Sequence, residues 1–122
     1  MIRVKTLTVQ LIDAQPDRIR ICRIDGESLV TVVVPREDLA EAKSLPNIPQ
    51  RGVYYLLDED HGNVSRVYAG QTTQGIARLD AHKAKKEFWN KAVMFLDDDQ
   101  NISKDALEVL EAKAIDYVRT HG

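Results

Sequence analysis

Five residues in the second half of the chain have side chains that could do chemistry: two tyrosines, an arginine, a histidine and a glutamate. The tyrosines, Tyr54 and Tyr68, lie on either side of a short polar segment that contains Gly62. Side chains alternate between the two faces of a strand, so paired strands can bring both phenols to one face. The alternative interpretation is two core tyrosines whose hydroxyl groups have internal hydrogen-bond partners.

The arginine and the histidine, Arg78 and His82, are four residues apart, which places them on one face of a helix. An arginine near a helix N-terminus can clamp a phosphate group. Gln71 and Thr72 precede this helix and are candidate nucleic-acid contacts. The alternative is a surface arginine with a solvated or capping histidine.

Basic side chains gather around this pair. Residues 78–91 contain five basic and two acidic residues, a local charge of +3, although the whole chain has a net charge of −2. Lys83 and Lys86 are therefore candidate phosphate contacts. A solvated helix face is the alternative explanation of such a charge run.

Glu111 lies within the apolar stripe of a helix predicted near the C-terminus, between Leu107 and Ile115. A carboxylate on an inward face must be paired with a cation such as Arg78, bind a metal ion or lie at the rim of a cleft. Because Mg²⁺ takes few protein carboxylates and keeps several waters, one glutamate would be sufficient to hold it.

Other candidates have simpler interpretations. We expect residues 97–99, three aspartates, to form a solvated turn, because adjacent carboxylates point apart. Phe88 and Trp89 are predicted core aromatics. Cys22, the single cysteine, excludes an internal disulfide and is predicted to be a small core residue.

The elements that position these residues fall into two segments. In residues 1–50, alternation predicts strands at 2–9 and 19–24, a hairpin turn at Asp25-Gly26 and a strand at 29–34. A short helix is expected over 36–42, with Leu39 and Ala42 on one side. Residues 44–50 contain two prolines and form the predicted linker.

In residues 51–122 we expect a strand at 52–57, a polar turn at 58–63 and a returning strand at 64–70. Thr72 or Thr73 would cap a helix that extends to about residue 86. A strand within 88–96 and a final helix over 103–119 complete the pattern. The sequence therefore predicts an α+β fold with a small, mostly antiparallel sheet flanked by helices, preceded by a β-rich N-terminal unit.

Bulk properties limit the function classes. With 122 residues, 43% of them hydrophobic, the chain can bury a core of its own. No stretch has the apolar length of a membrane span, and the first residues do not have the features of a signal peptide. We therefore expect a cytoplasmic protein without a membrane partner.

Two three-residue motifs accompany the candidate residues: Gly52-Val53-Tyr54 and Tyr68-Ala69-Gly70. Followed by Arg78, His82 and Glu111 in this order, they resemble the GIY-YIG nuclease family from about residue 51 to the C-terminus. Asn90 is similar to a polar residue of some members. Ala69 replaces the usual isoleucine or valine at a packing position, and a lysine that repair-type members carry near residue 71 is missing.

This resemblance implies a metal-dependent endonuclease that hydrolyses nucleic-acid phosphodiester bonds, with DNA as the expected substrate. Glu111 would hold Mg²⁺ or Mn²⁺, Tyr54 would activate the attacking water and Arg78 would stabilise the phosphorane charge. Tyr68 and His82 would position water and phosphate.

Two alternatives use the same fold without catalysis. One is a catalytically silent nucleic-acid binding module, and the other is a subunit of a larger DNA-processing complex. Bacterial relatives with a similar N-terminal segment usually continue further at the C-terminus, so the resemblance also implies a protein partner or a further domain.

Overall fold

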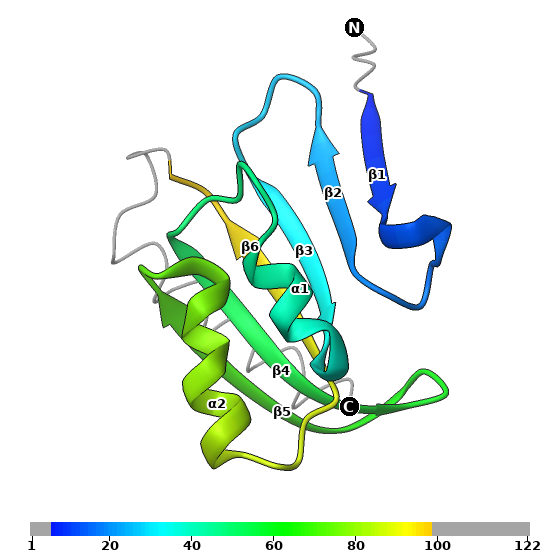
Figure 1. The fold of residues 1–122 in the computed structure, drawn as a ribbon, viewed down its shortest axis with the longest axis vertical. Coiled ribbons are helices and arrows are strands. Elements are labelled where there is room, and N and C mark those ends of the chain that lie inside the picture. Colours follow the sequence, from blue (N-terminus) through cyan, green and yellow to red (C-terminus); the bar gives the residue numbers. More distant parts are fainter. Residues whose placement is uncertain (1–5, 99–122) are drawn as a thin grey trace, which may run out of the picture.

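A computed structural model describes residues 6–98 of the chain. Figure 1 shows that the described α-helices lie together on one face of a single sheet. The six strands are all antiparallel to their neighbours and lie in the order β1-β2-β3-β6-β4-β5. The strands are β1 (Leu7–Leu11), β2 (Arg20–Ile24), β3 (Val30–Pro35), β4 (Gly52–Asp60), β5 (Asn63–Thr72) and β6 (Lys91–Leu96). The helical segments are η1 (Ile12–Ala14), η2 (Arg36–Asp38), α1 (Leu39–Lys43), η3 (Gly75–Arg78) and α2 (Leu79–Lys85).

The α+β class predicted from the sequence is confirmed, and so are most of the strand positions. Period-two alternation places Ile21 in the core, and Gly26 adopts a positive φ of 79° in the turn between β2 and β3. The 3₁₀ turn η1 was not predicted, and it contains two residues with positive φ, Asp13 and Ala14. The expected strand at residues 2–9 is described only from Leu7 onward.

The β4–β5 hairpin is longer than the sequence predicted. The polar segment 58–63 was expected to be a turn, but its residues continue both strands and leave only His61 and Gly62 between them. Both residues have positive φ, 50° and 82°. Two such residues form the tight turn whose twist matches that of antiparallel strands.

Strand β3 joins the two predicted segments of the chain. It pairs with β6 from Val30↔Leu96 to Pro35↔Lys91, and β6 pairs in turn with β4. One buried cluster contains residues from both sides of the predicted linker, for example Val32 and Leu56. Residues 6–50 and 51–98 thus share one sheet and one core, and the division of the chain into two domains stays a prediction.

The helical layer covers the face of the sheet that carries Tyr54 and Met94 (Figure 1). Leu39 and Ala42 of the predicted short helix are buried, as expected. The second helix begins at Gly75 rather than at a threonine cap, because its N-cap residue is Gln74. None of the described helices is long and apolar enough to cross a membrane.

Two predictions about polar residues were wrong. Cys22 is not a core residue: it is half-buried on the face of β2 opposite Ile21. The described part of the aspartate run departs from the predicted solvated turn at Asp97, whereas Asp98 is exposed as expected. Asp97 is buried and accepts a hydrogen bond from the Ser28 hydroxyl (3.0 Å), while Asp98 accepts one from the Gln50 main-chain N–H (2.7 Å). Trp89, in contrast, is a core aromatic as predicted.

Candidate active site

The two tyrosines lie on one face of the β4–β5 hairpin, as the alternation predicted. Tyr54 pairs with Gly70 and Leu56 pairs with Tyr68, so the tyrosines occupy diagonal positions. Their ring centroids are 6.4 Å apart. This is the face that α2 covers, which brings the hairpin and the helix together at the tyrosines.

His82 of α2 completes a cluster with both phenols. Its Nε2 atom is 2.6 Å from Tyr54 Oη, a distance typical of a short hydrogen bond. The imidazole centroid lies 5.4 Å from the ring of Tyr54 and 5.1 Å from that of Tyr68. Tyr54 and His82 are only 1% and 4% exposed, whereas Tyr68 is half-buried. Tyr68 therefore forms the more accessible side of the cluster.

Gly70 makes room for the Tyr54 phenol. A Cβ atom at this position would lie 2.5 Å from Tyr54 Oη and 2.6 Å from its Cζ. The glycine of the second three-residue motif is thus needed because the ring of the first motif lies against its main chain. The sequence marked Gly70 only as part of a motif, and the steric reason for a glycine is visible only in the structure.

Positive charge surrounds the imidazole. Burial lowers the pKa of His82 below its ordinary value, and the nearby charges of Lys86, Arg78 and Lys85 lower it further. The Lys86 ammonium also lies over the ring of Tyr68, 4.6 Å from its centroid. The cluster therefore contains a neutral histidine in a positive field, which favours a nearby anion such as a phosphate.

Arg36, a residue that the sequence analysis missed, holds the C-terminal end of α2. Its guanidinium donates hydrogen bonds to the carbonyl oxygens of Lys83 (2.8 Å), Lys86 (2.8 Å) and Trp89 (3.2 Å). It also stacks over the Trp89 ring at 4.6 Å. Because α2 carries His82, this N-terminal arginine helps to position the cluster, and no motif in the sequence marked it.

Arg78 is exposed at the junction of η3 and α2, one helical turn before His82. It therefore borders the cluster from the solvent side, as the i, i+4 spacing predicted. Lys83 is also exposed on α2. Glu111 lies outside the described residues, so its place relative to the cluster stays a prediction.

The remaining predicted nucleic-acid contacts are not part of this cluster. Gln71 lies on the opposite face of β5 from Tyr68. The buried Thr72 hydroxyl accepts from the Gln74 N–H (2.9 Å). The Asn90 amide bonds to the main chain of Glu59, at 3.1 Å to its N–H and 2.6 Å to its carbonyl oxygen. Thr72 and Asn90 thus have local structural bonds.

Within residues 6–98 the structure contains no group of three or more histidine, cysteine or acidic side chains that could hold a metal ion. The described part of the chain thus supplies the tyrosines, the histidine and the arginine. The predicted metal ligand, Glu111, would have to come from the rest.

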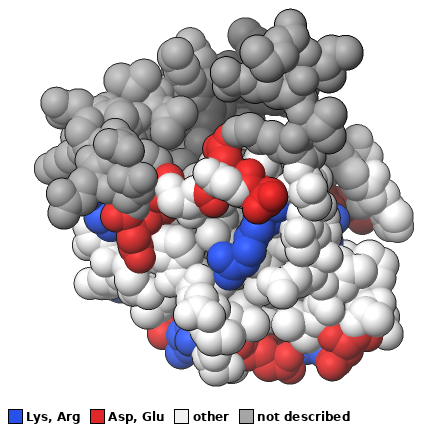
Figure 2. Space-filling view, turned by 90° about the horizontal axis from the view of Figure 1, so that it is seen from above, with Lys and Arg blue, Asp and Glu red and all other residues white. Residues whose placement is uncertain are grey.

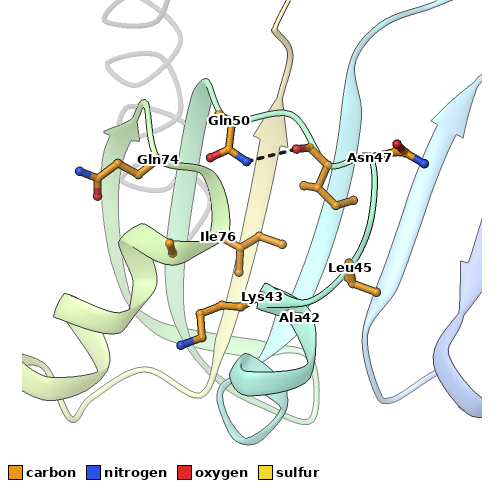
Figure 3. Close-up of a pocket in the computed structure, with 9 residues that line it drawn as sticks. Ala42, Lys43, Leu45, Asn47, Gln50, Gln74 and Ile76 are labelled. Atoms are coloured by element: carbon orange, nitrogen blue, oxygen red, sulfur yellow. Dashed lines mark hydrogen bonds between the residues drawn. The ribbon is translucent and has the colours of Figure 1, made fainter.

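A separate hollow of about 380 Å³ lies between α1, the loop that follows it and η3. Figure 3 shows Ile76 and Gln50 among the lining residues, with the Gln50 amide near the Ile48 carbonyl (3.4 Å). The side chains of Asn47 and Gln74 point away from each other. No residue of the tyrosine–histidine cluster lines this hollow.

The charges on one face of the molecule are mixed. In Figure 2 the basic side chains of the described residues are separated by acidic ones and do not form a continuous basic surface on that face. Affinity for nucleic acid comes largely from basic side chains that neutralise phosphates, so this face contributes little to such affinity.

Comparisons of the chain with protein-family models, with curated proteins and with solved structures found no match.

Proposed function

We propose that this protein is a divalent-metal-dependent endonuclease that hydrolyses phosphodiester bonds of nucleic acid, with DNA as the expected substrate. The observation that supports this most is the 2.6 Å contact between Tyr54 Oη and His82 Nε2, beside Tyr68 and beneath several cations. A phenol next to a neutral imidazole in a positive field has the surroundings that a general base requires.

In this proposal Tyr54 and His82 move a proton together. The neutral Nε2 of His82 accepts the proton of the Tyr54 O–H, which leaves a phenolate and an imidazolium. The phenolate then takes a proton from the attacking water. The positive charges of Lys86, Arg78 and Lys85 disfavour a lasting imidazolium, because with burial they lower the pKa of His82, and the same charges attract the anionic phosphate to the cluster.

The exposed Arg78 binds the phosphate and stabilises the negative charge that develops on it. Tyr68 lines the accessible side of the cluster and positions the phosphate with Lys86. Glu111 would hold Mg²⁺ or Mn²⁺, and the metal would supply positive charge to neutralise the phosphate and the leaving oxygen.

The test is cleavage of labelled single-stranded, duplex and branched DNA, and of RNA, with Mg²⁺ or Mn²⁺. Wild type is compared with Tyr54→Phe, Arg78→Ala and Glu111→Ala. Tyr55 provides a matched control, because Tyr55→Phe removes a hydroxyl from the opposite face of the same strand. Arg23→Ala removes an arginine from β2, three strands away from β4 in the sheet.

We expect wild type and both controls to cleave, and each of the three site variants to lose at least about a hundredfold in rate. Loss in all variants, controls included, would indicate a folding defect rather than a site. If Glu111→Ala cleaved as fast as wild type, the metal assignment would be wrong. Absence of cleavage by wild type on every substrate would contradict the enzymatic proposal.

The second candidate function is a catalytically silent nucleic-acid binding module. The burial of Tyr54 favours it, because a phenol that is 1% exposed and bonded to His82 can act as a structural link between β4 and α2. This candidate predicts binding that persists in EDTA and weakens with salt. It also predicts that Tyr54→Phe reduces stability but leaves binding unchanged.

A further inference from the structure

Strand β1 lies at one edge of the sheet (Figure 1). Every second residue of this strand has an exposed apolar side chain. Leu7, Val9 and Leu11 are 60%, 48% and 39% exposed, and Ile24, opposite Leu7 on β2, is 36% exposed. Edge strands are commonly protected against pairing by a charge, a proline or a bulge. The five residues of β1 contain no charge and no proline, and its pairing with β2 is regular.

The hydrogen bonds of β1 determine which main-chain groups point outward. Asp25 N–H donates to the Thr6 carbonyl (2.8 Å), and Ile12 N–H donates to the Ile19 carbonyl (3.2 Å). In an antiparallel ladder this direction alternates with every residue. The even-numbered residues of β1 therefore bond to β2, and its odd-numbered residues direct their N–H and C=O groups away from the sheet. Among the described strands, β1 pairs with β2 alone.

The residues of β1 have the same order of apolar and polar side chains when read from either end: Leu-Thr-Val-Gln-Leu. An antiparallel pair of two such strands, centred on Val9, places Leu7 opposite Leu11 of the second copy and Val9 opposite Val9. All of these positions have outward N–H and C=O groups. One register thus satisfies both the hydrogen bonds and the side-chain pairs.

We propose that β1 pairs antiparallel with β1 of a second copy of this chain, with a two-fold axis at Val9. The two six-stranded sheets become one sheet of twelve strands, with a continuous apolar stripe across the junction. A self-complementary patch is what a two-fold dimer requires, whereas an unrelated strand would match only the main chain. Four strands separate β5 from β1, so the tyrosine–histidine cluster of each copy lies away from the junction and the proposal is independent of catalysis.

The first test is sedimentation equilibrium of the full chain over a wide concentration range. We expect a monomer–dimer equilibrium for wild type. Val9→Lys places two ammonium groups opposite each other at the axis, and like charges directly opposite are unfavourable, so dimerisation weakens by at least about tenfold. Gln10→Lys is the matched control: it adds the same charge to the same strand on its other face, and leaves dimerisation unchanged.

Cross-linking tests the register directly. In a Cys22→Ser background, Val9→Cys is expected to give a disulfide-linked dimer on mild oxidation, because directly opposite Cα atoms at a hydrogen-bonded position are about 5.5 Å apart. Gln10→Cys in the same background is expected to form little disulfide-linked dimer, because Gln10 lies opposite Thr8 of the second copy and not opposite itself. A wild type that is monomeric at every concentration would overturn the proposal and leave the edge to a different partner. A dimer that resists Val9→Lys would overturn it as well.

Discussion

Strand β4 lies between β5 and β6, whereas β1 has a single neighbour at the edge of the sheet. β1 has apolar residues at alternate positions, and β4 has five in succession over residues 53–57. Tyr54 and Leu56 are 1% and 0% exposed, whereas all five residues of β1 are exposed. The helices α1 and α2 cover the central strands and do not reach β1 (Figure 1). The two strands therefore differ in surroundings as well as in sequence: the centre holds the candidate site, and the edge carries the pairing proposed above.

The largest loss of stability is expected from a substitution at Gly52, in the central strand β4. A Cβ atom there would lie 1.9 Å from the Phe95 carbonyl oxygen, which is a main-chain atom of the neighbouring strand and cannot move alone. We expect Gly52→Ala to reduce the free energy of unfolding by about 4 kcal/mol or more, measured by urea denaturation. Gly26→Ala is the control, because nothing lies within 4 Å of that position, and its positive φ costs about 1 kcal/mol. Equal losses for the two variants would contradict the steric explanation.

The same substitution at two leucines compares the centre with the edge directly. Leu56→Ala removes a fully buried side chain from β4 and should reduce stability by about 3 kcal/mol. Leu7→Ala truncates a side chain that is 60% exposed and should change stability by less than about 0.5 kcal/mol. Both are measured at low protein concentration, so that association at β1 does not contribute. A large loss for Leu7→Ala under these conditions would mean that the edge is covered in the monomer.

Arg36 connects the N-terminal half of the chain to the candidate site. Arg36→Lys keeps the charge but cannot reach three carbonyl oxygens or stack on Trp89 in the same way. We expect a loss of about 2 kcal/mol in the free energy of unfolding. Arg23→Lys, which removes a single bond to a main-chain oxygen (3.3 Å), should have a much smaller effect. Similar effects of the two variants would show that Arg36 does not hold α2.

His82 should give the protein a pH-dependent stability. Its pKa is lowered in the folded state, so below the ordinary imidazole pKa of about 6.5 the unfolded chain binds a proton that the folded chain resists. Stability is therefore constant above about pH 7.5 and falls as the pH drops toward the lowered pKa, by at most about 1.4 kcal/mol per pH unit. His82→Gln should flatten this dependence between pH 5 and 7.5 in urea titrations. His61→Gln is the control, because it removes an exposed histidine. If the pH dependence of stability were unchanged in His82→Gln, the assignment of this dependence to His82 would be wrong.

The sequence was a good guide wherever a local pattern determined the structure. Alternation predicted the faces of Tyr54 and Tyr68, and the four-residue spacing placed Arg78 and His82 along one helix. Turn residues such as Asp25-Gly26 predicted the turn that connects the two strands of a hairpin. These properties follow from strand and helix periodicity, which depends only on neighbours along the chain.

Other features depended on contacts between distant segments, and the sequence could not predict them. Cys22 alternates with core residues in a way that fits either face of its strand, and the sheet turns it away from the helices. The carboxylates of Asp97 and Asp98 meet Ser28 and Gln50 only because β6 ends beside the loops that carry them.

The sequence by itself thus determined the α+β class and most strand positions, and it supplied the candidate residues of the proposed phosphate chemistry. Only the tertiary structure decided that β3 joins β6, that Gly70 admits the Tyr54 ring and that Tyr54 bonds to His82. The physical reason is that main-chain hydrogen bonding is the same for any pair of strands. The order of strands depends on which side chains fill the common core, and that is a property of the whole chain.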